Sequence, residues 1–192
     1  MPQRIIDLAN AHPAIRSITF AGSRAEGRAI ELSDWDFLVE ADDFAAAAEA
    51  LPHLLAPLKP LAQQWDRLSR EHCWMLILDG PAKVDLIFPG ESHALEPPWE
   101  PAAGNLEAID VHFWDWMLWL NAKEARGSER VEEELQKLFE HLLGPLGGRR
   151  RPSSVAEAVA EYRAARDAAE ARFGVTVDRR VEAAVAPVLG RR

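Results

Sequence analysis

Residues 18–40 of the chain, ITFAGSRAEGRAIELSDWDFLVE, carry the pattern on which the interpretation of this sequence depends. Alternating polar and apolar residues lead into Gly22-Ser23, which predicts a strand that ends in a tight turn. After ten further residues, Asp34 and Asp36 stand at the start of a second predicted strand. Residues i and i+2 of a strand point to the same face, so both carboxylates should aim at one point. The segment therefore predicts a site where two acidic side chains lie near a Gly-Ser turn.

These residue types suit a nucleoside triphosphate bound with a metal ion. Paired carboxylates are hard oxygen ligands of the kind that Mg²⁺ prefers, and Mg²⁺ commonly takes substrate phosphates as further ligands. Gly22 allows the backbone to approach a phosphate closely, and Ser23 can donate its hydroxyl and N–H to phosphate oxygens. A helix beginning at Ser23 would add a favourable dipole. Arg24 is a further candidate for nucleotide binding, although a solvated loop explains it equally well.

A third carboxylate lies in the segment KVDLIF, residues 83–88. This segment and CWMLILD, residues 73–79, flank a turn-rich tetrapeptide, which predicts a β-hairpin. Asp85 is interpreted as the only charge inside an otherwise apolar strand, where a carboxylate is rarely found unless it is paired or binds a metal. A surface acid on an edge strand is the alternative. If this strand lies beside residues 34–40, Asp85 completes a three-carboxylate site that could hold two ions.

The Gly-Ser turn, the two aspartates after it and the later lone aspartate resemble the DNA polymerase β-type nucleotidyltransferase superfamily, most closely its minimal and antibiotic-modifying branches. The resemblance covers about residues 15–90. It implies a short mixed sheet with flanking helices, and transfer of a nucleoside monophosphate to a hydroxyl with release of pyrophosphate. It also implies that Asp34 and Asp36 hold the nucleotide-bound metal and, together with Asp85, the catalytic one.

The remaining pattern predicts an α+β chain with two domains. An amphipathic helix should begin at Pro2, and a second helix over residues 42–58 should be broken or kinked by Pro52 and Pro57. Residues 89–104 are dense in Pro and Gly and predict a connection. Helical periodicity predicts later helices at residues 111–126, 131–143, 154–174 and from 178. We therefore expect a small mixed-sheet nucleotidyltransferase domain at 1–92 and a C-terminal helical bundle domain at 105–192.

The Trp-rich helix at residues 111–126 supplies further candidates. Lys123 lies near its end, and the resemblance implies that basic residues on the helical side reach the triphosphate. Helix C-termini favour cations in any case, so a structural role for Lys123 stays open. Asp110, Asp115 and Glu124 are candidates for a general base, and the sequence does not rank them.

Charge and composition restrict the partners and the location. The formal net charge is -9, and residues 1–100 hold 8 Lys/Arg against 16 Asp/Glu. This balance argues against nucleic acid and favours a small or cationic acceptor. No apolar run approaches the roughly 18 residues of a membrane span, and the N-terminus has too short an apolar run for a signal peptide. The single cysteine, Cys73, fits a buried thiol in a reducing cytoplasm. A homodimer is compatible with the sequence.

Three functions are compared on these grounds. The first is transfer of AMP from ATP to a hydroxyl of a small molecule, such as an amine-bearing alcohol. The second is AMP attachment to a protein by an antitoxin-type enzyme, whose chains usually end soon after the third carboxylate, whereas this one continues for about 100 residues. The third is a non-catalytic nucleotide-binding module, in which at least one carboxylate should be missing. The first hypothesis agrees best with the sequence.

Overall fold

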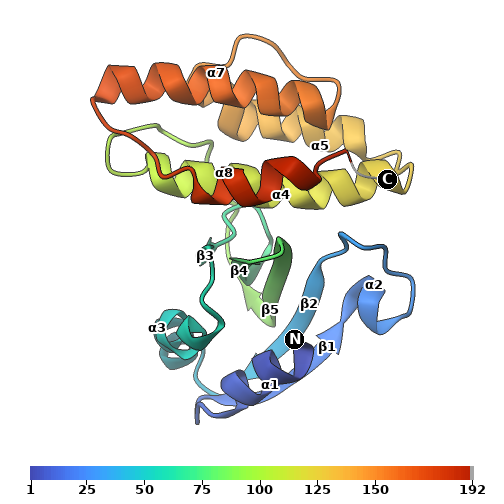
Figure 1. Ribbon diagram of the computed structural model, residues 1–192. Helices are drawn as coiled ribbons and strands as arrows, with labels where there is room; N and C mark the ends of the chain where they lie inside the picture. The colour runs from blue at the N-terminus through green and yellow to red at the C-terminus, as the bar shows by residue number, and fades with distance from the viewer. Residues whose placement is uncertain (191–192) are drawn as a thin grey trace. The chain divides into compact units, whose positions relative to one another are not determined.

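The computed structural model describes residues 1–190, which form two compact units, Met1–Glu96 and the residues from Pro97 onward. The division lies inside the Pro- and Gly-rich segment at 89–104. The first unit combines a β-sheet with helices, and the described part of the second contains helices and no strand (Figure 1).

A five-stranded mixed sheet forms the framework of the first unit, in the order β1-β2-β5-β4-β3. Only β2 and β5 pair in parallel; the other neighbouring strands are antiparallel. The mixed sheet and the β4–β5 hairpin agree with the sequence prediction, and β3 was not predicted. The strands are β1 (Ile15–Ala21), β2 (Trp35–Ala41), β3 (Ala62–Trp65), β4 (Glu71–Leu78) and β5 (Ala82–Ser92).

Two helices, α1 (Pro2–Asn10) and α3 (Phe44–Leu54), pack against one face of this sheet. Alternation along each strand sends every second side chain toward these helices, which leaves the other set on the opposite face. Apolar side chains from both helices and four strands share one core cluster, which removes their surface from water. Fully buried members are Ile5, Ala9, Phe37, Ala47, Leu51, Leu55, Leu76, Val84, Leu86 and Phe88.

Pro52 does not break the helix, because α3 continues through this residue to Leu54, and a kink there stays a prediction. The helix begins after Asp43, whose carboxylate accepts a hydrogen bond from the Ala46 N–H at 3.0 Å. Such a cap satisfies one of the N–H groups that a first helical turn leaves unpaired. Pro52 lies in the last turn of α3, so few hydrogen bonds of the helix follow it. Pro57 lies in the first turn of a 3₁₀ segment, η1 (Ala56–Leu58), where its missing N–H is not needed.

The second unit is arranged around α4, which contacts α5, α7 and α8. The sequence of α4 is apolar on nearly every side, which predicts a central helix. Most of its residues are indeed buried. Ser154 caps α7, and Gly174 ends it in a left-handed conformation. The helical segments are α4 (Leu106–Ala125), α5 (Val131–Leu138), the π turn η2 (Phe139–Leu143), α6 (Gly144–Leu146), α7 (Val155–Phe173), α8 (Arg180–Val185) and the 3₁₀ turn η3 (Ala186–Val188). Within residues 1–190, no helix has both the length and the hydropathy that crossing a bilayer requires.

Candidate functional site

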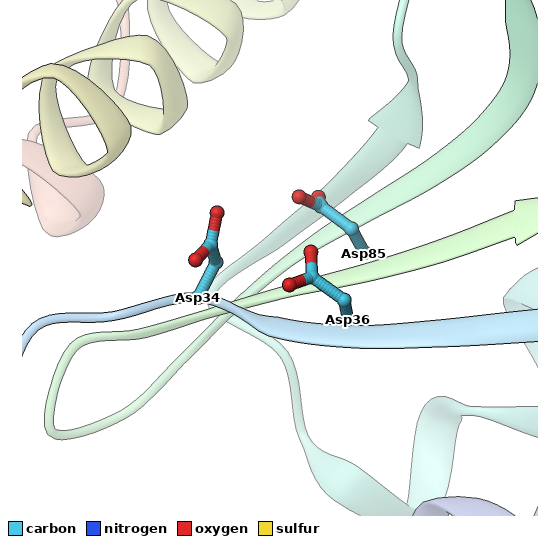
Figure 2. A group of neighbouring side chains, drawn as sticks. All are labelled: Asp34, Asp36 and Asp85. Atoms are coloured by element: carbon cyan, nitrogen blue, oxygen red, sulfur yellow. The ribbon is translucent and has the colours of Figure 1, made fainter. Parts of the chain in front are cut away.

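Three carboxylates converge on the face of the sheet opposite α1 and α3. Parallel pairing of β2 and β5 places Asp36 directly beside Asp85, and Asp34 lies just before β2 begins. One carboxylate oxygen from each residue lies within 4.8 Å of those of the other two. Figure 2 shows all three side chains projecting to the same side of the strands. Three oxygen donors at this spacing could surround a divalent cation.

The Gly-Ser turn lies against this group. Strand β1 pairs with β2 so that Ala21 faces Asp36, which brings Gly22 next to the same carboxylate. Gly22 has φ +68°, and a Cβ on it would lie 1.8 Å from the Asp36 Oδ2 atom. The helix expected at Ser23 is a single turn, α2 (Gly22–Ala25). A macrodipole needs many aligned peptide units, so the short turn contributes its local N–H groups rather than a helix dipole.

Replacing Gly22 by alanine should disrupt the carboxylates as well as strain the backbone. The left-handed conformation should cost about 1–2 kcal/mol for any residue with a Cβ. Gly27→Ala is a matched control, because Gly27 has φ +69° and nothing lies within 4 Å of the position that a methyl group would take there. Both variants should lose stability in urea unfolding, Gly22→Ala at least as much as Gly27→Ala, but only Gly22→Ala should weaken Mn²⁺ binding. Equal Mn²⁺ affinity in the two variants would show that contact with Asp36 is unimportant.

Lys83 is a part of the site that the sequence analysis overlooked. Its Nζ atom lies 2.6 Å from Asp85 Oδ1, and the two side chains are only 7% and 12% exposed. The interpretation of Asp85 as the only charge in its strand is therefore wrong, because β5 already begins at Ala82. The signal was present in the sequence, since residues two apart in a strand share a face.

The surroundings of Asp85 oppose its ionisation. Burial raises the pKa of the Asp85 carboxyl above its ordinary value, the Lys83 ammonium acts in the opposite direction, and the negative charge of Asp34 raises the pKa further. A carboxylate in such a position gains from a cation that neutralises the group, because like charges in proximity disfavour one another.

The two basic residues predicted to bind nucleotide have local partners. The Arg24 guanidinium donates to the carbonyl oxygens of Ser33 and Glu31, at 2.8 and 2.6 Å. Lys123 lies in the last turn of α4 in the second unit, with its ammonium 4.8 Å from the centre of the Trp119 ring. Nucleotide binding by either residue stays a prediction, as it does for Gly22 and Ser23.

Among the candidates for a general base, Asp110 is buried inside the second unit and is held there by hydrogen bonds. It is 1% exposed, and its Oδ1 atom accepts hydrogen bonds from the Tyr162 hydroxyl at 2.6 Å and the Trp114 Nε1–H at 3.1 Å. The Arg166 guanidinium lies 3.7 Å from the same oxygen. Burial raises the pKa of Asp110 to about 6. These contacts join α4 to α7, so we assign Asp110 to the packing of the second unit.

Comparison with known proteins gives distant structural likenesses. No protein-family model matches the chain, and no curated protein matches it at a significant level. A cytoplasmic RNA terminal U-transferase is similar to 62% of this chain at 18% identity and a TM-score of 0.36, and the chain spans 37% of that protein's length. An aminoglycoside 6-adenyltransferase from Bacillus subtilis is similar over 95% of this chain and 94% of its own, at 14% identity and a TM-score of 0.34. Both TM-scores are low, so the function is inferred from the site itself.

Proposed function

We propose that this protein is a metal-dependent nucleotidyltransferase that moves a nucleoside monophosphate, AMP from ATP, to a hydroxyl of a small acceptor. The observation that carries the proposal is the convergence of Asp34, Asp36 and Asp85 beside the Gly-Ser turn. Each component alone has ordinary structural explanations. Their combination on one face of the sheet matches what a triphosphate and its cation require.

The donor set fits Mg²⁺. All three side chains offer carboxylate oxygens, the hard ligands that this ion prefers, and their separation allows them to share it. Asp34, Asp36 and Asp85 would hold the metal, which supplies neutralisation of charge on the phosphates and the reacting oxygens. Three carboxylates lie together here, and the Lys83 ammonium pairs with one of them, Asp85.

The chain's own residues would bind and orient the triphosphate. Gly22 lets the Asp36 carboxylate lie directly against the turn, and Ser23 offers a hydroxyl and an N–H to phosphate oxygens. In the reaction, the acceptor oxygen forms a bond to the α-phosphorus and gives up its proton to solvent water. The bond from the α-phosphorus to the bridging oxygen breaks, and pyrophosphate leaves with the electron pair. Correct placement of the two reactants accounts for a large share of the rate in such a displacement.

The acidic balance of the first hundred residues supports an acceptor that is small and carries amines as well as hydroxyls. With 8 Lys/Arg against 16 Asp/Glu, this region should attract a small polycation and repel a phosphate backbone. An aminoglycoside-like alcohol has the required chemistry. A protein is the main competing acceptor, and the same charge balance disfavours RNA.

Transfer can be tested with each labelled NTP in turn, in the presence of Mg²⁺, against aminoglycosides, neutral sugars, single-stranded RNA and protein. We expect a labelled aminoglycoside and an equal amount of pyrophosphate with ATP, and neither product when EDTA is present. Calorimetry should likewise show tighter ATP binding with Mg²⁺ than with EDTA. Label on RNA or protein would correct the acceptor only. Absence of every product, together with equal ATP affinity in Mg²⁺ and EDTA, would overturn the proposed function.

A further inference from the structure

The side chain of Arg24 connects the Gly-Ser turn to the residues just before the carboxylates. Arg24 follows Ser23 directly, and its Nε–H donates to the carbonyl oxygen of Ser33 at 2.8 Å. A terminal nitrogen donates to the carbonyl oxygen of Glu31 at 2.6 Å. Because Ser33 immediately precedes Asp34, one guanidinium links the two ends of the loop on which the site depends.

The Arg24 guanidinium also lies over an aromatic ring, that of Trp35. Its guanidinium carbon lies 4.2 Å from the centre of the Trp35 ring, which in turn stacks on Phe20 with ring centres 5.7 Å apart. Trp35 and Asp36 are consecutive in β2, so their side chains leave the strand on opposite faces. The guanidinium therefore stacks on an aromatic ring of the face that Asp36 does not use.

Other hydrogen bonds in the same loop hold Ser33, whose carbonyl oxygen accepts from Arg24, in place. Ser33 is 3% exposed, and its Oγ atom accepts a hydrogen bond from the Ile30 N–H at 2.8 Å. The Ser33 N–H donates to the Ile30 carbonyl oxygen at 3.0 Å, and the Arg28 N–H donates to the Ser23 carbonyl oxygen at 2.8 Å. Hydrogen bonds thus fix the start of the loop, at Ser23, and its end, at Ser33. Arg24 links these two ends.

We propose that Arg24 is a positioning residue, whose guanidinium sets the Gly-Ser turn and Asp34 at a fixed separation, and that it does not bind phosphate. This inference rests on the proposed function, because it treats Asp34 as a metal ligand. A planar guanidinium can donate in two directions and stack on an indole at the same time. A lysine ammonium keeps the charge but lacks the rigid fork and the flat face. Arg24→Lys should therefore fail almost as completely as Arg24→Met.

The test compares Arg24→Lys and Arg24→Met with Arg28→Met as the matched control. Arg28 lies in the same loop, is 70% exposed and pairs with the neighbouring Glu26. Mn²⁺ binding without nucleotide, followed by the EPR signal of the free ion, should weaken by about 10–100-fold in both Arg24 variants, the range typical of residues that orient a metal ligand. Hydrogen exchange of the amides at 26–34 should accelerate in the same two variants. Arg28→Met should match the unaltered protein in both measurements.

A phosphate ligand would give the opposite pattern. Arg24→Lys would then keep part of the nucleotide affinity through its charge, Arg24→Met would raise the KM for the nucleotide, and neither Mn²⁺ affinity nor exchange at 26–34 would change. That result would overturn the proposal, as would normal behaviour of Arg24→Lys. If the unaltered protein binds no Mn²⁺, the metal assignment of the proposed function fails, and the exchange rates alone decide whether Arg24 fixes the loop. Thermal unfolding of each variant would confirm that it is folded.

Discussion

Replacement of Asp36 by asparagine is expected to lower the rate of nucleotidyl transfer by more than about 100-fold, beyond the loss typical of residues that only orient a ligand. Asp36 lies between Asp85 on the neighbouring strand and the Gly-Ser turn on the other side. Asparagine has nearly the same shape but supplies no charge to a metal. Because the change also removes one of three neighbouring negative charges, thermal unfolding should show an unchanged or higher melting temperature.

The same strand offers a matched control, Glu40→Gln. Glu40 lies on the same face as Asp36, four residues further along β2, and its carboxylate accepts a hydrogen bond from the Ser17 hydroxyl at 3.1 Å. This variant loses the same charge outside the group of three carboxylates and should transfer at close to the normal rate. Retention of activity in Asp36→Asn within tenfold of Glu40→Gln would contradict the metal assignment.

The buried pair of Lys83 and Asp85 should produce the largest effect on stability. Removing either partner breaks a buried ion pair, which should lower the free energy of unfolding by about 3–5 kcal/mol. If Lys83 were absent, Asp85→Asn would replace a lone buried carboxylate and would be expected to cost little stability. The ion pair at 2.6 Å reverses that expectation. Urea unfolding of Lys83→Met and Asp85→Asn would measure the two losses.

A double variant separates the ion pair from simple packing damage. Lys83→Met combined with Asp85→Leu replaces both charges by apolar groups, an exchange that is often neutral or stabilising for a buried pair. The double variant should therefore recover most of the stability lost by either single change, although it should not catalyse transfer. If the losses of the single variants simply add in the double variant, the two side chains do not interact energetically.

Local patterns were sufficient to predict much of the first unit. The apolar runs on both sides of Asp79–Pro81 predicted the β4–β5 hairpin that the structure confirms. Alternation predicted Asp34 and Asp36 on one strand, but only Asp36 lies in β2, and Asp34 just precedes it. Strand β3 was missed because its four residues include Gln63 and Gln64 and lack a clear apolar alternation. Lys83 was missed because its place on the same strand face as Asp85, two residues earlier in the segment KVDLIF, was not considered.

The sequence could not show which distant strands pair. It supported only the conditional statement that Asp85 joins the site if its strand lies beside residues 34–40. Nothing in the local sequence specifies that β5 adds to β2 in parallel, with Asp36 opposite Asp85. That register depends on how α3, β3 and β4 return the chain to the far side of β2. Likewise, burial of Leu106 and Ile109 extends α4 toward the N-terminus beyond the predicted start at 111. Packing decides such boundaries, and periodicity alone cannot.

The parallel register of β2 and β5 also determines when the site can form during folding. Asp36 and Asp85 become neighbours only after the chain between them has closed, and pairings so distant in sequence are slow because loop entropy opposes them. An unfolded chain would offer isolated aspartates with little affinity for a divalent ion. Metal uptake during refolding should therefore follow completion of the sheet, and saturating metal should slow or reverse its opening by mass action.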